Sequence, residues 1–158
     1  MSLAPDVSER LAFLTRVVKR EVALLLETRC LLFGADASWS LPVGDLPTPL
    51  AERLDAFVAR FARLQDTVGD KLLPVLLAAL AEPVGAVIDN LNRAERLGWL
   101  TSVETWRSVR ALRNQMVHEY VEDRHVLQSA LIAARDAVPM LCDTAERLCD
   151  EVALRTKQ

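Results

Sequence analysis

The stretch LQSALIAARDAVPMLCDTAERLCDEV, residues 127–152, decides the fold class of this chain. Its apolar side chains recur at alternating steps of four and three residues, a spacing that places them on one face of a helix. These positions are Leu127, Leu131, Ala134, Val138, Leu141, Ala145, Leu148 and Val152. Such a face is typical of a helix that packs lengthwise on other helices. We therefore expect a helix from about Asp123 to Leu154, bent at Pro139.

The composition of the whole chain fits a helical bundle. Hydrophobic residues make up 51% of the 158 residues but aromatic ones only 5%, so aliphatic side chains must fill the core. No segment alternates with period two for long enough to make a convincing strand. The length suits one domain. We predict a single all-α domain over residues 1–158, an up-and-down bundle of four long helices plus a shorter one.

Proline and glycine divide the first half of the chain. A first helix is expected over residues 8–33, and a second begins near residue 49 or 50 and is kinked or interrupted at Pro74. The connection over residues 34–50 is long for a compact domain, and loops of that length are usually functional or disordered. We expect Trp39, within this loop, to pack back on the bundle.

A shorter helix is expected over residues 84–97, ended by Gly98. Three of its apolar residues are spaced to share the side that we expect to face the core: Val87, Ile88 and Leu91. Directly after it, Thr101-Ser102-Val103-Glu104 fits a capping box, so a fourth helix should begin at Thr101 or Ser102.

The fourth helix places a charge where a hydrophobic residue is expected. Its apolar seam is formed by Trp106, Val109 and Met116. Arg113 occupies a position of the same seam, and a guanidinium there needs either a partner or a solvent-filled cleft. Asp66 and Asp70 on the second helix are the natural candidates for that partner, although Asp70 is at least as well explained as a solvated acid.

The segment RNQMVHEY, residues 113–120, holds one of only two histidines and the only tyrosine of the chain. Asn114 and His118 lie one turn apart beside the seam, and Arg107 and Arg110 extend the same flank toward the N-terminus. An arginine or a histidine alone at such a position is more often structural. Their conjunction with a tyrosine on one amphipathic helix indicates a functional site instead.

The spacing Arg113-x4-His118-x-Tyr120, with Asn114 directly after the arginine, resembles the signature of the HEPN superfamily in its HepT-like branch. That branch comprises small all-α ribonuclease toxins, usually partnered by a minimal nucleotidyltransferase antitoxin. We judge the resemblance to extend over about residues 54–152. It implies a homodimer whose two motif helices face each other across a cleft.

Other segments carry the same resemblance. Residues 94–98 (AERLG), 102–106 (SVETW) and 60–66 (RFARLQD) look like the corresponding parts of that branch. The last of these segments ends in Asp66, which the resemblance therefore favours over Asp70 as the partner of Arg113.

The geometry of an ideal helix limits how the site can be assembled. Arg113 and His118 are five residues apart, or about 140° around the helix axis. They converge on one phosphate only if the helix ends or loosens near His118, or if two chains contribute. His118 suits proton transfer near neutral pH, and Arg113 suits the negative charge that develops on a phosphorane. Asn114 would position the substrate or the imidazole, and Tyr120 would donate to a phosphate or orient it.

We therefore expect a metal-independent endoribonuclease toxin of a type II or type VII-like toxin–antitoxin pair, in which the ribose 2′-hydroxyl attacks the phosphate. Arg107 and Arg110 are candidates for binding the RNA, and no cofactor or metal is expected. The resemblance implies that the partner nucleotidyltransferase adenylylates Tyr120. The alternative is a non-catalytic helical subunit that supports a nucleotidyltransferase or presents substrate to it.

Charge and cysteine content restrict the setting. A net charge of −3 argues against a globally basic surface for nucleic acid but allows a local basic patch. Cys30, Cys142 and Cys149 form no metal-binding pattern, and an odd number of cysteines is typical of reduced thiols. Charged residues interrupt the apolar segments, so no membrane span is expected. We expect a cytoplasmic protein whose partners are RNA, a second copy of the chain and the nucleotidyltransferase.

Overall fold

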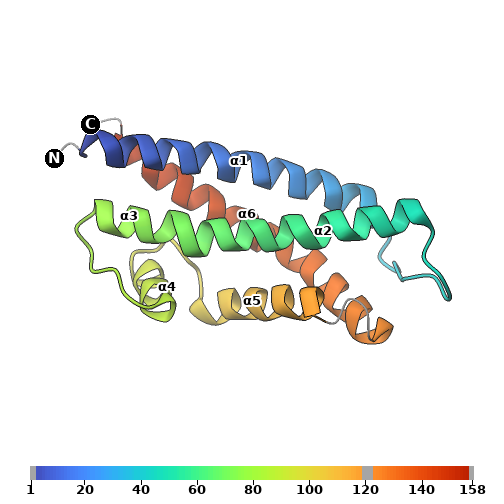
Figure 1. The fold of residues 1–158 in the computed structure, drawn as a ribbon. Coiled ribbons are helices and arrows are strands. Elements are labelled where there is room, and N and C mark those ends of the chain that lie inside the picture. Colours follow the sequence, from blue (N-terminus) through green and yellow to red (C-terminus); the bar gives the residue numbers. More distant parts are fainter. Residues whose placement is uncertain (1–2, 119–122, 157–158) are drawn as a thin grey trace.

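The computed structural model describes residues 3–118 and 123–156, and every regular element within them is a helix (Figure 1). The all-helical fold class is thus confirmed. In chain order the elements are α1 (Pro5–Phe33), α2 (Thr48–Asp66), the π-helical segment η1 (Thr67–Leu72), α3 (Leu73–Ala79), α4 (Val87–Arg96), α5 (Val103–His118) and α6 (Arg124–Thr156).

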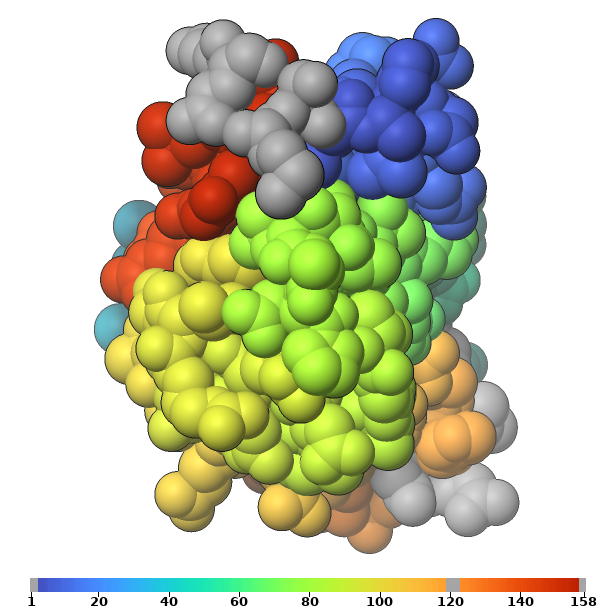
Figure 2. Space-filling model, turned by 90° about the vertical axis from the view of Figure 1, so that its left-hand side faces the viewer, coloured from blue at the N-terminus to red at the C-terminus, as the bar shows by residue number. Residues whose placement is uncertain are grey.

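The long rods run alternately in opposite directions (Figure 1). α2, η1 and α3 follow one another without a break and form one rod antiparallel to α1. α1 contacts α2 and α6, and α5 contacts the same two helices from the other side. The short α4 contacts α3, η1 and α5, and it covers the end of the bundle seen in Figure 2.

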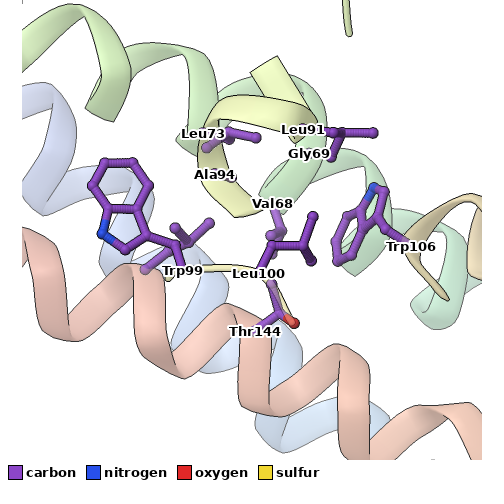
Figure 3. A pocket seen from close by; sticks show the side chains of 10 residues that line it. Val68, Gly69, Leu73, Leu91, Ala94, Trp99, Leu100, Trp106 and Thr144 are labelled. Carbon is purple, nitrogen blue, oxygen red and sulfur yellow. The ribbon is translucent and has the colours of Figure 1, made fainter. Parts of the chain in front are cut away.

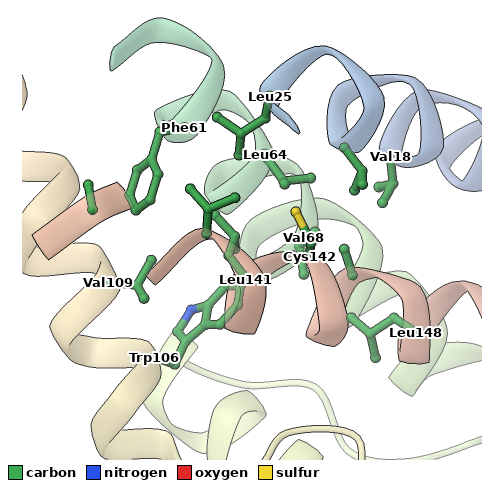
Figure 4. Close-up of a cluster of buried hydrophobic side chains, with 14 of the residues drawn as sticks. Val18, Leu25, Phe61, Leu64, Val68, Trp106, Val109, Leu141, Cys142 and Leu148 are labelled. Atoms are coloured by element: carbon green, nitrogen blue, oxygen red, sulfur yellow. The ribbon is translucent and has the colours of Figure 1, made fainter. Parts of the chain in front are cut away.

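The core lies where the apolar stripes of these rods meet. All eight seam positions predicted for the last helix are buried, which confirms that periodicity. In Figure 4, side chains from α1, α2, α5 and α6 converge between the helices. Burying one such leucine or phenylalanine contributes about 1.5–3 kcal/mol relative to leaving it exposed. Packing of this kind fixes where α5 lies against α2, and α5 carries the candidate site.

α6 continues through Pro139. Proline has no backbone N–H, so the carbonyl of Arg135, four residues earlier, loses its helical donor. The Nε of Arg29 on α1 donates to that carbonyl oxygen at 2.9 Å. A side chain of the first helix therefore replaces the hydrogen bond that proline removes from the last one.

Several helix boundaries differ from the prediction. α1 begins at Pro5 rather than near residue 8, because proline is well tolerated in the first turn of a helix. The second rod is interrupted just before Pro74 and continues beyond it, in agreement with the predicted kink or interruption. Six residues, Thr67–Leu72, form a π-helical turn just before it, and the α-helix then resumes to Ala79 with Pro74 as its second residue.

The prediction of which residues of the short helix face the core is wrong in part. Val87 and Ile88 are 39% and 42% exposed, whereas Leu91 is buried as expected. Asn90 turns inward in their place, because its side chain both accepts from the backbone N–H of Gly85 (3.0 Å) and donates to the carbonyl of Gly85 (3.3 Å). This pair of hydrogen bonds fixes the rotation of α4, and hydrophobic periodicity alone does not detect it.

The start of α5 is capped by Ser102, one of the two predicted positions. The Oγ of Ser102 accepts a hydrogen bond from the backbone N–H of Thr105 at 3.2 Å. The predicted box between Thr101 and Glu104 is not the cap. Glu95 of α4 accepts from the backbone N–H of Val103 at 2.6 Å instead, so a carboxylate from a neighbouring helix supplies the second contact.

The loop after α1 packs against the bundle. The ring of Trp39 meets the ring of Phe33 edge-on, with the centroids 4.6 Å apart, which confirms that this tryptophan packs back. At the start of α6, the guanidinium of Arg124 donates to the carbonyls of Pro42 and Gly44. None of the helices in the described ranges is both long enough and apolar enough to cross a membrane.

Candidate functional site on helix α5

Arg113 lies in the buried seam of α5 and faces an acid on the neighbouring rod. Trp106 and Met116, on either side of it along the seam, are 1% and 0% exposed. The side chain of Arg113 keeps 29% of its surface exposed, and its Nη2 lies 3.2 Å from Oδ2 of Asp66 at the end of α2. The charge in the seam thus has a carboxylate partner from the helix that α5 packs against.

A second ion pair lies one turn away. Nη1 of Arg110 is 3.5 Å from Oδ1 of Asp70, which belongs to the π-helical segment. Asp70 is therefore paired rather than simply solvated, although both side chains are well exposed. The two pairs run in opposite order along α5 and the second rod, as expected for antiparallel rods.

Asn114 contacts the same guanidinium. Its Oδ1 accepts from Nη1 of Arg113 at 3.1 Å, so the guanidinium has one partner on its own helix and one on α2. The third nitrogen, Nε, is buried and finds no hydrogen-bond partner among the described residues. Arg113 is thus oriented from two sides at its tip.

The remaining motif residues lie elsewhere on the helix. Arg107, Asn114 and His118 are exposed, and on an ideal helix they fall within about 40° of one another on the side opposite the buried seam. α5 stays helical up to His118, its last residue, so His118 remains about 140° away from Arg113 around the axis. One chain therefore does not bring these two side chains to a single phosphate. Tyr120 lies outside the described residues.

Sequence reasoning missed Gln65 and the polar edge of Trp106. Gln65 is 0% exposed, and both its amide oxygen and its amide nitrogen are buried without a hydrogen-bond partner within the described part of the chain; the same holds for Nε1 of Trp106. A signal was present, because Gln65 lies one turn after the buried Phe61, at a position where the helical period demands a hydrophobic residue.

Gly69 makes room for the tryptophan. A Cβ at this position would lie 3.1 Å from Cζ2 of Trp106, closer than carbon atoms normally pack. The indole therefore rests directly on the backbone of the π-helical turn. π-Helical turns inside α-helices are frequent at functional sites.

Two cavities of the described part of the chain lie away from Arg113 and His118. A small apolar cavity of about 10 Å³, with Trp99, Leu100, Trp106 and Thr144 among its walls, has room for about one water (Figure 3). A wider groove of about 320 Å³ lies between α1 and α6, with Lys19, Glu146 and Asp150 at its rim. Neither Arg113 nor His118 lines either of these two cavities.

Titratable groups elsewhere have clear causes for their shifts. Burial raises the pKa of Glu21, and a hydrogen bond from the Thr67 hydroxyl (3.1 Å) opposes that rise. Burial raises the pKa of the Cys142 thiol to about 11, which makes it unreactive at neutral pH. Within residues 3–118 and 123–156, no group of three or more His, Cys, Asp or Glu side chains is arranged to hold a metal ion.

No protein-family model matches the sequence, and neither a curated protein nor a solved structure is significantly similar to it. The likeness to the HepT-like branch therefore rests on the motif spacing and the neighbouring segments of the sequence itself.

Proposed function

We propose that this protein is a metal-independent endoribonuclease of the HepT-like kind, acting in the cytoplasm as the toxin partner of a minimal nucleotidyltransferase. The observation that carries the proposal is the position of Arg113. A guanidinium in an otherwise apolar seam is costly, yet here it is held by Asp66 and Asn114 with part of its surface open to solvent. A bundle stabilised only by packing has no need of such a residue.

The chemistry follows from the side chains on α5. A proton leaves the ribose 2′-hydroxyl, the 2′-oxygen bonds to phosphorus, and the bond to the 5′-oxygen breaks as that oxygen receives a proton. His118 transfers protons in this reaction, and Arg113 stabilises the charge on the phosphorane. Arg107 and Arg110 bind flanking phosphates. The product is a 2′,3′-cyclic phosphate.

The site requires a second copy of the chain. Because Arg113 and His118 are about 140° apart on an unbroken helix, His118 of one copy must approach Arg113 of the other for both to reach one phosphate. The edge of α5 between Arg113 and His118, where Asn114 contacts the guanidinium, is the surface that would face the cleft between two copies. A monomer in light scattering at micromolar concentration would count against this assembly.

Control by the partner would act on Tyr120. Adenylylation of its hydroxyl adds a negatively charged phosphate and a bulky nucleoside beside the basic residues of α5. Both the charge and the bulk would compete with the RNA phosphate.

The decisive experiment is RNA cleavage in the presence of EDTA. We expect the purified protein to cut RNA and leave 2′,3′-cyclic phosphate ends, and we expect His118→Ala to abolish cleavage. His125→Ala is the matched control, because His125 is also exposed but lies on the first turn of α6. Loss of activity in EDTA with recovery in magnesium would refute the mechanism, as would full activity of His118→Ala.

One observation favours a second candidate, a non-catalytic subunit that supports a nucleotidyltransferase. The charges of Arg113 and Arg110 are already balanced by Asp66 and Asp70, which weakens both as phosphate ligands. Absence of RNA cleavage under all conditions, together with a stable complex with a nucleotidyltransferase, would favour this candidate.

A further inference from the structure

The contact between α5 and the second rod contains four buried polar atoms that lack hydrogen-bond partners among the described residues. They are Oε1 and Nε2 of Gln65, Nε1 of Trp106 and Nε of Arg113. A buried polar atom left without a partner costs about 1–3 kcal/mol, so several in one place call for an explanation. Their grouping on two facing helices suggests that they belong to one another.

The register of the helices brings these side chains to one level. Trp106 packs on Gly69, and Arg113 pairs with Asp66. Gln65 directly precedes Asp66 and lies one turn before Gly69, on the side of it nearer to Arg113. Along the rod it therefore lies one residue beyond Asp66 and one turn beyond Gly69, at the level of Arg113.

The orientation of the donors agrees with this placement. Side chains on a helix lean toward its N-terminus, so Arg113 reaches back along α5 toward Trp106. Figure 4 shows the indole nitrogen of Trp106 on the side of the ring nearer to Val109, which is the direction of Arg113 along the helix. Both unpaired donors thus point into the same part of the contact.

Their chemistry is complementary. An indole N–H and an arginine Nε–H can only donate, whereas the amide oxygen of glutamine accepts two hydrogen bonds. Gln65 is the buried residue in this contact whose oxygen is free to accept both.

We propose that Gln65 is a positioning residue for Arg113: its amide oxygen accepts hydrogen bonds from Nε of Arg113 and Nε1 of Trp106, directly after a rotation of the side chain or through one buried water. Asp66 and Asn114 then hold the tip of the guanidinium while Gln65 holds its base. Three anchors fix the plane of the guanidinium, which fixes the direction in which it can present a fork to a phosphate. The hydrogen bonds stand independently of the proposed function; only their catalytic consequence rests on it.

NMR of the side-chain N–H groups tests the hydrogen bonds without reference to activity. In the native protein we expect slowly exchanging resonances for the Nε–H of Arg113, identified by its loss in Arg113→Lys, and for the indole N–H of Trp106. Gln65→Met removes the acceptor at nearly constant size, and we expect hydrogen exchange of both groups to rise about tenfold or more. The indole N–H of Trp99 should stay unchanged, and Gln115→Met, an exposed glutamine on α5, should change none of them.

Gln65→Glu provides the conservative variant, because a carboxylate still accepts both hydrogen bonds. We expect it to retain slow exchange, with both resonances shifted by the stronger, charge-assisted bonds. A folded Gln65→Met protein with unchanged exchange would overturn the proposal. If Gln65→Met does not fold, Gln65→Glu decides instead. The proposal is then overturned if the Nε–H resonance of Arg113 and the indole N–H resonance of Trp106 have the same chemical shifts in Gln65→Glu as in the native protein.

RNA cleavage by the same variants separates this proposal from the proposed function. If the native protein cleaves RNA, Gln65→Met should lower kcat about tenfold with KM within about twofold, because orientation rather than binding is lost. Equal kcat in both proteins would refute the positioning role. If the native protein does not cleave RNA, the proposed function fails, and the exchange data still decide whether Gln65 anchors Arg113.

Discussion

The ion pair between Asp66 and Arg113 should be a measurable part of the stability of the bundle. The atoms are 3.2 Å apart, and the side chains are 38% and 29% exposed. Two charges about 4 Å apart near a protein surface attract by about 4 kcal/mol, but solvent screening and side-chain entropy remove most of that energy when the partners are a third exposed. We therefore expect a coupling energy of about 1–2 kcal/mol, between the values for exposed and buried pairs.

A double-mutant cycle measures this coupling directly. Asp66→Asn, Arg113→Ala and the double variant are unfolded in urea, and Asp66→Asn alone should lower Tm by about 2–8 °C for a chain of this size. The matched control is the ion pair between Arg110 and Asp70. Its N–O distance is longer, 3.5 Å, and the side chain of Arg110 is 44% exposed. The coupling energy of this pair should therefore stay below about 1 kcal/mol. A coupling near zero for Asp66 and Arg113, or a larger one for the control pair, would show that Arg113 is not held in the seam by this carboxylate.

Three further predictions concern other parts of the molecule. Gly69→Ala gains about 0.5–1 kcal/mol of helix propensity, but its Cβ would lie 3.1 Å from Cζ2 of the buried Trp106, so we expect a net loss of about 0.5–2 kcal/mol in the free energy of unfolding; urea denaturation measures the loss. The raised pKa of Glu21 means that the folded state binds its proton more tightly, so stability falls as pH rises from the ordinary value of 4.5 through the raised one. The Tm of Glu21→Gln should thus be higher than that of the native protein at pH 7, and the two Tm values should be similar at pH 4. Iodoacetamide at pH 8, followed by mass spectrometry, should label the exposed Cys30 well before the buried Cys142, whose pKa is about 11; equal rates would contradict the buried position.

Periodicity predicted the parts of the fold that packing alone determines. The seam of α6 and the stripe of α5 around Trp106 repeat at helical spacing over several turns, so a single misplaced residue does not change their direction. The short α4 has too few turns for the hydrophobic pattern to define which of its faces is buried. Its rotation is set by hydrogen bonds between Asn90 and the backbone of Gly85, and a hydrophobic pattern carries no information about such bonds.

The candidate site was partly visible in the sequence. Arg113 stood out because a charge replaced an apolar residue in the seam, and an acid facing it was the physical consequence. Gln65 is also a polar residue at a core position, but it carries no charge, so its burial does not require an oppositely charged partner. The pairing of Asp70 depends on the register between two rods, which is set by packing over their whole length rather than by any local motif.

Because of the hydrogen bond from Arg29 to the carbonyl of Arg135, the stability of α6 near Pro139 depends on the docking of α1. A peptide of α6 alone would contain a joint at Pro139, where water must replace the missing donor and the two halves can swing apart. In the folded chain the donor arrives from a residue 106 positions earlier in the sequence. α6 therefore becomes rigid at Pro139 only after α1 has docked on it. Undocking of α1 would make the middle of α6 flexible as well as exposing its surface.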